Sequence, residues 1–195
     1  MRSLHPLVLV LVLALALTLV RDAAAGTPTE QLRERIDRAV GILEDGALKT
    51  APAARRAALR TVAGEIFDFT EITRRALGPH WLKTTQAERD ELVQLLTAQM
   101  ERAYIGRIEQ YSGGRIAWVG ESVEGDLATV RTRFLATSGE IPVDYRLARS
   151  GDRWLAYDVS IEGVSLVSSY RAQFNKVIQT SSTQGLVERL RAKQE

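Results

Sequence analysis

Strictly alternating apolar and polar positions predict four antiparallel strands in the second half of the chain. Every second residue is apolar at 141–147 and again at 154–161, and a Ser-Gly-Asp turn at 150–152 separates the two runs. Shorter and longer alternating segments at 116–120 and 127–136 predict two more strands. Because Gly-containing turns connect all four segments, we expect an antiparallel meander.

A period of three to four residues predicts helices before this sheet. Their starts carry recognisable capping residues, and glycines mark several of their ends. The predicted starts are Thr27-Pro28, Pro52, Asp68 and Thr85, and the predicted ends include Gly46, Gly78-Pro79 and Gly113-Gly114.

After Gly163 the apolar period changes from two residues to about 3.6, which predicts a helix from Val164 to Ile178. A last helix is predicted around Leu186–Leu190. Helices, then strands, then helices indicate an α+β fold, in which helices cover a curved antiparallel sheet of about four strands. An apolar cavity is expected between sheet and helices, because such an arrangement is suited to enclosing an apolar ligand.

The first 25 residues have the pattern of a secretory signal peptide. Arg2 precedes an apolar run from Leu7 to Leu17, and Ala23-Ala24-Ala25 provides small residues for cleavage after Ala25. The run is shorter than the roughly 20 apolar residues of a membrane span. We therefore expect residues 1–25 to be removed, leaving a single domain at 26–195, of a length that buries one core. The chain has no cysteine, so the exported domain must rely on that core rather than on disulfides.

Charge and motif content argue against nucleic-acid binding and catalysis. The formal charge is +2, with both signs interleaved and no dense basic run. His80 is the only histidine outside the leader, no Gly-x-Ser-x-Gly motif accompanies it, and no Gly-rich phosphate loop is present. One histidine without cysteine also disfavours a zinc or iron site. The expected protein is not an enzyme and uses no cofactor.

Five segments of the chain together resemble the MlaC family. Residues 143–147 (VDYRL), 154–159 with Trp154 and Tyr157-Asp158-Val159, 162–166 (EGVSL) and 170–174 (YRAQF) are similar to its C-terminal signature. The segment 67–85, with Phe67-Asp68-Phe69 at its start, resembles its N-terminal motif. The family is also called the toluene-tolerance or ABC-transporter auxiliary family.

This resemblance implies a periplasmic phospholipid carrier that moves lipid between the inner and outer membranes. The implied partners are phospholipid, an inner-membrane ABC transporter complex and an outer-membrane lipoprotein–porin complex, and the carrier is expected to be a monomer. Apolar side chains are expected to line its lipid pocket. They are Phe67, Ile72, Leu77, Leu92, Leu96, Met100, Tyr104, Val130, Phe134, Val143, Tyr145, Tyr157, Val164, Val167, Tyr170 and Phe174.

Alternative functions and two structural expectations accompany this hypothesis. A carrier of another apolar molecule such as a hopanoid or sterol, a small enzyme on a cone-shaped α+β scaffold with an acidic base, and an interaction module with a solid core all fit the same elements. Hinges are expected at Gly163 and Gly78-Pro79. A polar network is expected to hold the helix after Gly163 to the sheet, with the members Arg146, Arg171, Asp144 and Asp158.

Overall fold

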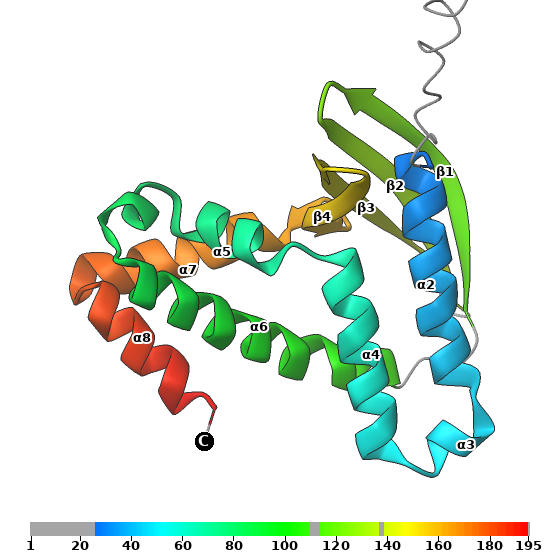
Figure 1. The fold of residues 1–195 in the computed structure, drawn as a ribbon, viewed down its shortest axis with the longest axis horizontal. Coiled ribbons are helices and arrows are strands. Elements are labelled where there is room, and N and C mark those ends of the chain that lie inside the picture. The colour runs from blue at the N-terminus through cyan, green and yellow to red at the C-terminus, as the bar shows by residue number, and fades with distance from the viewer. Residues whose placement is uncertain (1–25, 110–113, 137–138, 195) are drawn as a thin grey trace, which may run out of the picture.

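The computed structural model describes residues 26–109, 114–136 and 139–194 (Figure 1). Helices fill its N-terminal half. They are α2 (Pro28–Glu44), α3 (Gly46–Lys49), α4 (Pro52–Ile66), α5 (Phe69–Leu77), the 3-10 helix η2 (Gly78–Lys83) and α6 (Gln86–Glu109). In the part of the chain that is described, no helix is long and apolar enough to cross a membrane.

A sheet and two further helices follow. The strands are β1 (Arg115–Glu124), β2 (Leu127–Ala136), β3 (Gly139–Ser150), β4 (Arg153–Ile161) and β5 (Val164–Ser165), and the helices are α7 (Leu166–Thr180) and α8 (Thr183–Ala192). The strands pair in chain order, and every pair is antiparallel. The predicted α+β class and the four-stranded meander are confirmed, with the two-residue β5 added at one edge.

The end of β1 and the start of α7 differ from the prediction. The strand β1 continues to Glu124 instead of ending at Gly120, because a bulge between Trp118 and Gly120 breaks the alternation but not the pairing with β2. The predicted helix from Val164 begins at Leu166 instead. Val164 pairs with Ile161 in β5, and the Ser165 side chain accepts the Ser168 N–H at 3.0 Å as the helix cap.

The predicted helix starts are confirmed, with changes in local detail. Thr27 and Glu30 form a capping box at α2, and Thr85 caps α6 by accepting the Glu88 N–H. Asp68 accepts the Glu71 N–H at 2.8 Å, but the Glu71 carboxylate is used by arginines further along α5. The first helix ends at Glu44 and is followed by the one-turn α3, and part of the predicted stop at 113–114 lies outside the described residues.

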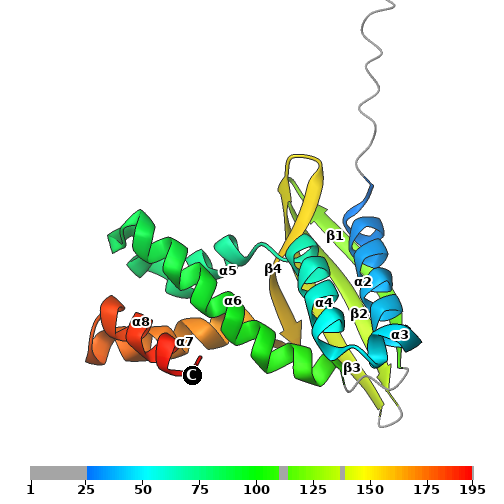
Figure 2. The same cartoon turned by 60° about the horizontal axis from the view of Figure 1, so that its bottom comes forward.

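The helices form two groups around two apolar clusters (Figures 1 and 2). Helices α2 and α4 cover one side of the sheet, and their cluster includes Leu32, Val62, Val130 and Leu147. Helices α5, α6, α7 and α8 build a second cluster of their own, which joins the sheet through β4. Only the first group lies flat on the sheet, whereas the second contacts it through β4. Phe67 packs against both clusters.

A bulge at Tyr157 gives β4 two buried sides. Arg146 of β3 pairs with Asp158, whereas Leu147 pairs with Ala156, so Tyr157 is the extra residue. Trp154 and Ala156 are buried in the α2/α4 cluster. The alternation in the sequence had instead placed every second residue from Leu155 to Ile161 on the buried face. The segment between α4 and α5 runs beside this strand, because the Asp68 N–H donates to the Ala156 carbonyl at 3.0 Å.

Candidate functional site

The helix-facing side of the sheet changes along β2 and β3 from fully buried to half-buried. Val130 and Leu147 have no exposed surface beneath α2 and α4. Towards the other end of the same side, Tyr145, Val143 and Phe134 are only half-buried. The strand register and the two-residue period place all five on one face. An apolar surface that continues the core therefore remains partly uncovered around Val143.

Tyr145 lies at the boundary between these two zones. Its ring packs against the α2/α4 cluster, and burial raises the pKa of its phenol to about 12. The direction follows from the apolar environment, which disfavours the charged phenolate. The surroundings of Tyr145 thus suit hydrocarbon better than a charged ligand.

Most of the predicted pocket residues on helices pack together in one core. Eight are buried in the cluster of α5 to α8, and Phe67 and Tyr104 pack against it. The eight are Ile72, Leu77, Leu92, Leu96, Met100, Val167, Tyr170 and Phe174. Burial in this core raises the pKa of Tyr170 to about 12, and its ring lies 5.8 Å from that of Phe174.

The sheet residues of the predicted site form a separate group. Val130, Phe134, Val143 and Tyr145 share the helix-facing side of β2 and β3. The structure therefore brings the predicted site together as two apolar groups, and Phe67 lies between them.

Two predicted pocket residues lie outside both groups. Val164 is 61% exposed, because β5 places it at the edge of the sheet before α7 begins. The Tyr157 ring lies under the guanidinium of Arg75, 3.8 Å from the ring centroid, at the bulge of β4. Neither position follows from the sequence pattern, which continued the helix and the strand alternation through these residues.

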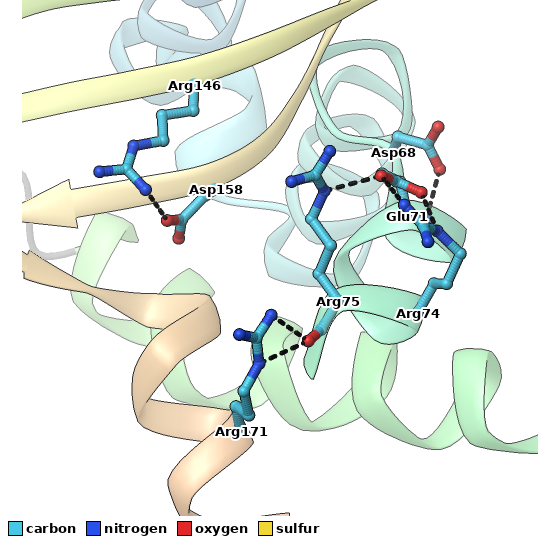
Figure 3. Close-up of polar contacts among 7 residues, drawn as sticks. All are labelled: Asp68, Glu71, Arg74, Arg75, Arg146, Asp158 and Arg171. Atoms are coloured by element: carbon cyan, nitrogen blue, oxygen red, sulfur yellow. Dashed lines mark hydrogen bonds and ion pairs between the residues drawn. The ribbon is translucent and has the colours of Figure 1, made fainter. Parts of the chain in front are cut away.

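A buried carboxylate joins the sheet to α7 (Figure 3). Asp158 accepts hydrogen bonds from the Ser165 hydroxyl at 2.7 Å and from the Val167 N–H at 3.1 Å. Arg146 Nη1 lies 3.6 Å from the same carboxylate. A negative charge at the first turn of a helix is favourable, because it faces unpaired N–H groups and the positive end of the helix dipole.

The predicted polar network is smaller than expected. Arg171 reaches α5 instead of the sheet and donates two hydrogen bonds to the Arg75 carbonyl, at 2.8 and 2.6 Å (Figure 3). Among the described residues, no hydrogen bond or ion pair joins Asp144 to Arg146 or Asp158. The expectation is correct for Arg146 and Asp158 and wrong for the other two, because α7 is tied separately to β4 and to α5.

Glu71 organises the arginines of α5 on the same side of the molecule. It accepts hydrogen bonds from Arg74 and Arg75, at 2.5 and 2.7 Å. The hydrogen bond from Arg74 is the main cause of the lowered pKa of Glu71, which holds this carboxylate in its charged form. The anchored Arg75 then covers Tyr157 and offers its carbonyl to Arg171.

Reactive groups are sparse in the described part of the chain. No group of three or more histidine, cysteine, aspartate or glutamate side chains there is arranged to hold a metal ion. His80 Nε2 lies 3.1 Å from Asn175 Oδ1, so this histidine connects η2 to α7. The polar contacts at these positions hold elements together.

Sequence reasoning missed several residues of the half-buried surface. Ile161 pairs directly with Val143, and Ile116 pairs with Phe134, so both lie on the same side of the sheet. Trp118 packs against the α2/α4 cluster from β1. The alternation marked these positions as apolar, but only the cross-strand register shows that Ile161 adjoins Val143 and that Ile116 adjoins Phe134.

Comparison with known proteins identifies the family. A family model described as "MlaC protein" matches residues 33–192, most of the chain. The chain belongs to the MlaC family. The fold of this MlaC-family chain is similar to that of a phospholipid-binding protein from Ralstonia solanacearum, solved in complex with a phospholipid. The two are 23% identical with a TM-score of 0.76, and the match covers 86% of this chain and 96% of that chain.

Proposed function

We propose that this MlaC-family protein is a periplasmic carrier that binds phospholipid and shuttles it between the inner and outer membranes. The observation that carries the proposal is the partly uncovered apolar side of the sheet around Tyr145 and Val143, in a chain of this family. The similar fold of a protein solved with a bound phospholipid supports the same choice of ligand.

The cost of exposing acyl chains sets what such a carrier must do. Two chains hold roughly 30 methylenes, so their exposure to water costs on the order of 20 kcal/mol at about 0.8 kcal/mol for each methylene. Both tails must therefore be enclosed. We propose that they lie along the side of the sheet that carries Val143 and Tyr145, and that the α5–α8 core forms the opposite wall. We propose that all sixteen predicted pocket residues contribute to this pocket. Val164 and Tyr157 must move to reach a tail.

Export and partners complete the proposal. Residues 1–25 act as a cleaved signal peptide, and the mature domain takes lipid from or delivers it to two membrane complexes. These are an inner-membrane ABC transporter complex and an outer-membrane lipoprotein–porin complex. Release requires that a partner favours a more open state of the carrier, since a ligand or partner shifts an equilibrium only by its differential affinity for the two states.

Native mass spectrometry of protein purified from the periplasm of its host tests this function. Co-purifying phospholipid is the expected result. Co-purification of a polycyclic lipid instead would show that the cargo is another apolar molecule. Protein that remains empty after mild purification would overturn the carrier function. Because the masses of intact complexes are measured, the number of lipids bound to each chain follows from the same spectra.

A further inference from the structure

A cleft lies between α6, α7 and α8, away from the half-buried side of the sheet. Its volume is about 190 Å³, and its apolar lining comes from Phe174, Val177, Leu186 and Leu190. Ligand pockets usually enclose about 300–1,000 Å³, so this cleft is too small for a two-tailed lipid. It can accept one or two apolar side chains.

Cations surround this apolar lining. Lys176 of α7, Arg189 of α8 and Lys193, which directly follows α8, all line the cleft. Among the described residues, none of the three takes part in an ion pair, whereas the neighbouring Arg191 is paired with Glu91 of α6. The helix α7 contains no acidic residue, and Glu188 is the only one in α8. The cleft is therefore complementary to negative charge.

A buried hydrogen-bonding atom adds an independent requirement. Gln99 of α6 lines the same cleft. Among the described residues, its Oε1 atom is buried without a hydrogen-bond partner. A buried acceptor left unpaired costs about 1–3 kcal/mol, so a bound group that donates an N–H here would gain affinity.

We propose that this cleft docks an acidic amphipathic segment of a partner protein. Carboxylates of the segment face Lys176, Arg189 and Lys193, one of its apolar side chains enters between Phe174 and Leu190, and one of its N–H groups satisfies the amide of Gln99. A peptide supplies all three kinds of group. An anionic bilayer supplies the charge, but its broad surface does not enter a cleft of this size.

The inference deepens the proposed function and rests on it for the role of the partner, because a carrier that exchanges cargo must dock on other proteins. The docking cleft also shares Phe174 with the core of α5 to α8. Docking would therefore press on a residue whose ring packs against Tyr170, inside the wall that we propose for the lipid site.

Photo-crosslinking in the host cell tests the docking site. A photoreactive amino acid replaces the exposed Gln173 in the full chain, which otherwise keeps its sequence. The expected product is a covalent adduct with a protein segment rich in Asp and Glu, identified by mass spectrometry of the linked peptides. Replacing Lys176, Arg189 and Lys193 by Glu in the same chain should reduce this adduct about tenfold, because like charges then oppose docking.

A matched variant with three reversed charges elsewhere is the control. Lys49, Arg115 and Arg131 are exposed and lie outside the cleft, so their replacement by Glu should leave the adduct within about twofold of the unmodified chain. Adducts with lipid alone, adducts with a segment that lacks acidic residues, or an adduct unchanged by the Lys176, Arg189 and Lys193 reversals would each overturn the docking site.

Native mass spectrometry of the same variants separates this inference from the proposed function. The charge-reversed cleft variant should keep its co-purifying phospholipid, because its three changed residues are not part of the predicted lipid pocket. If the unmodified protein carries no lipid but crosslinks to an acidic segment, the carrier function fails and the docking cleft stands. If it carries lipid without such a crosslink, the docking cleft fails and the carrier function stands.

Discussion

The carboxylate of Asp158 in β4 accepts the backbone N–H of Val167 in the first turn of α7, at 3.1 Å. Asp158 is only 4% exposed, so water competes little for this bond. The last long strand and the helix that follows it are thus joined by a side chain rather than by the short β5 alone. This joint fixes where α7 leaves the sheet.

Removing the Asp158 carboxylate should destabilise the protein markedly. Asp158→Ala leaves the Val167 N–H and the Ser165 hydroxyl without their acceptor, and we expect a loss of about 2–4 kcal/mol in the free energy of unfolding. Urea denaturation followed by circular dichroism measures it. The control Asp126→Ala removes an exposed carboxylate near Arg149 and should change stability by less than about 0.5 kcal/mol. Equal losses in both variants would show that the buried Asp158 carboxylate contributes no more stability than an exposed one.

A charge on the half-buried side of the sheet should abolish lipid binding. Val143→Asp places a carboxylate where we propose that acyl chains lie, and an unpaired charge beside hydrocarbon is strongly unfavourable. The expected result in native mass spectrometry is folded protein without lipid. Val119→Asp is the matched control, because Val119 is 54% exposed on β1. Folded Val143→Asp protein that still holds lipid would remove Val143 from the site.

Tyr104→Glu tests the opposite wall in the same way. Tyr104 is half-buried and packs against the α5–α8 core, so a carboxylate there should exclude a tail from the helix side. Lipid occupancy is again measured by native mass spectrometry, and circular dichroism checks that the variant is folded. Unchanged occupancy would place the tails away from α6.

Alkaline pH should weaken the fold through two tyrosines. Burial raises the pKa of Tyr145 and of Tyr170 from 10 to about 12, so the folded protein holds both phenolic protons more tightly than the unfolded chain. This contribution to stability is complete below pH 10 and is lost as the pH rises through 12. Thermal unfolding measured between pH 9 and 12 should show a falling melting temperature.

Single substitutions assign this pH dependence. Tyr145→Phe and Tyr170→Phe each remove one ionisable group, so each should flatten the decline in stability between pH 10 and 12. Ultraviolet absorbance of tyrosinate should show two phenols that ionise only near pH 12 in the folded protein. A titration in which all tyrosines ionise together near pH 10 would contradict the apolar environment described for Tyr145.

Of the two proposed hinges, the turn at Gly163 is the one whose movement requires side-chain hydrogen bonds to break. Glu162 and Gly163 both have positive φ, 51° and 80°, which suits a tight turn between β4 and β5. Movement at this turn must also break the bonds of Asp158 to Ser165 and Val167. We therefore expect amide hydrogen exchange at 163–167 to be slow in lipid-loaded protein and faster in lipid-free protein. Exchange as slow as that of β2 in both forms would exclude this hinge.

Gly78 offers the second hinge, with a φ of 54° at the end of α5. A substitution to Ala should cost about 1–3 kcal/mol of stability, because a φ of 54° combined with a ψ of −128° is sparsely populated by residues with a Cβ atom. The exchange experiment on lipid-loaded and lipid-free protein also reports on this position. Equal exchange of the Gly78 N–H, which donates to the Arg74 carbonyl, in the two forms would show that opening occurs elsewhere.

The sequence was sufficient to predict the elements but not how they are divided between two cores. Capping residues such as Thr27, Asp68 and Thr85 act locally, so the starts of three helices could be predicted from short segments. The apolar stripes of α2 and α5 look alike in sequence, yet one packs on the sheet and the other packs on helices. That division depends on contacts between distant segments, which periodicity does not report.

The candidate site, like the fold, could be predicted in part from the sequence. Val143 and Tyr145 follow directly from the alternation of β3, and the structure places them on the half-buried side of the sheet. Tyr157 and Val164 do not behave as their patterns indicate, because a bulge and a two-residue strand change the direction of their side chains. Bulges result from pairing with a neighbouring strand, so a single strand's sequence shows them poorly.

The bulge between Trp118 and Gly120 affects whether two molecules can pair through the edges of their sheets. In the described sheet, β1 is an outer strand, and a straight outer strand invites backbone pairing with a second molecule. The kink interrupts the even spacing of donors and acceptors that such pairing needs, and the Thr29 N–H and hydroxyl bind Glu121 at 2.9 and 2.6 Å, which brings the start of α2 against that strand. This edge of the sheet is thereby protected from backbone pairing with a second copy of the chain.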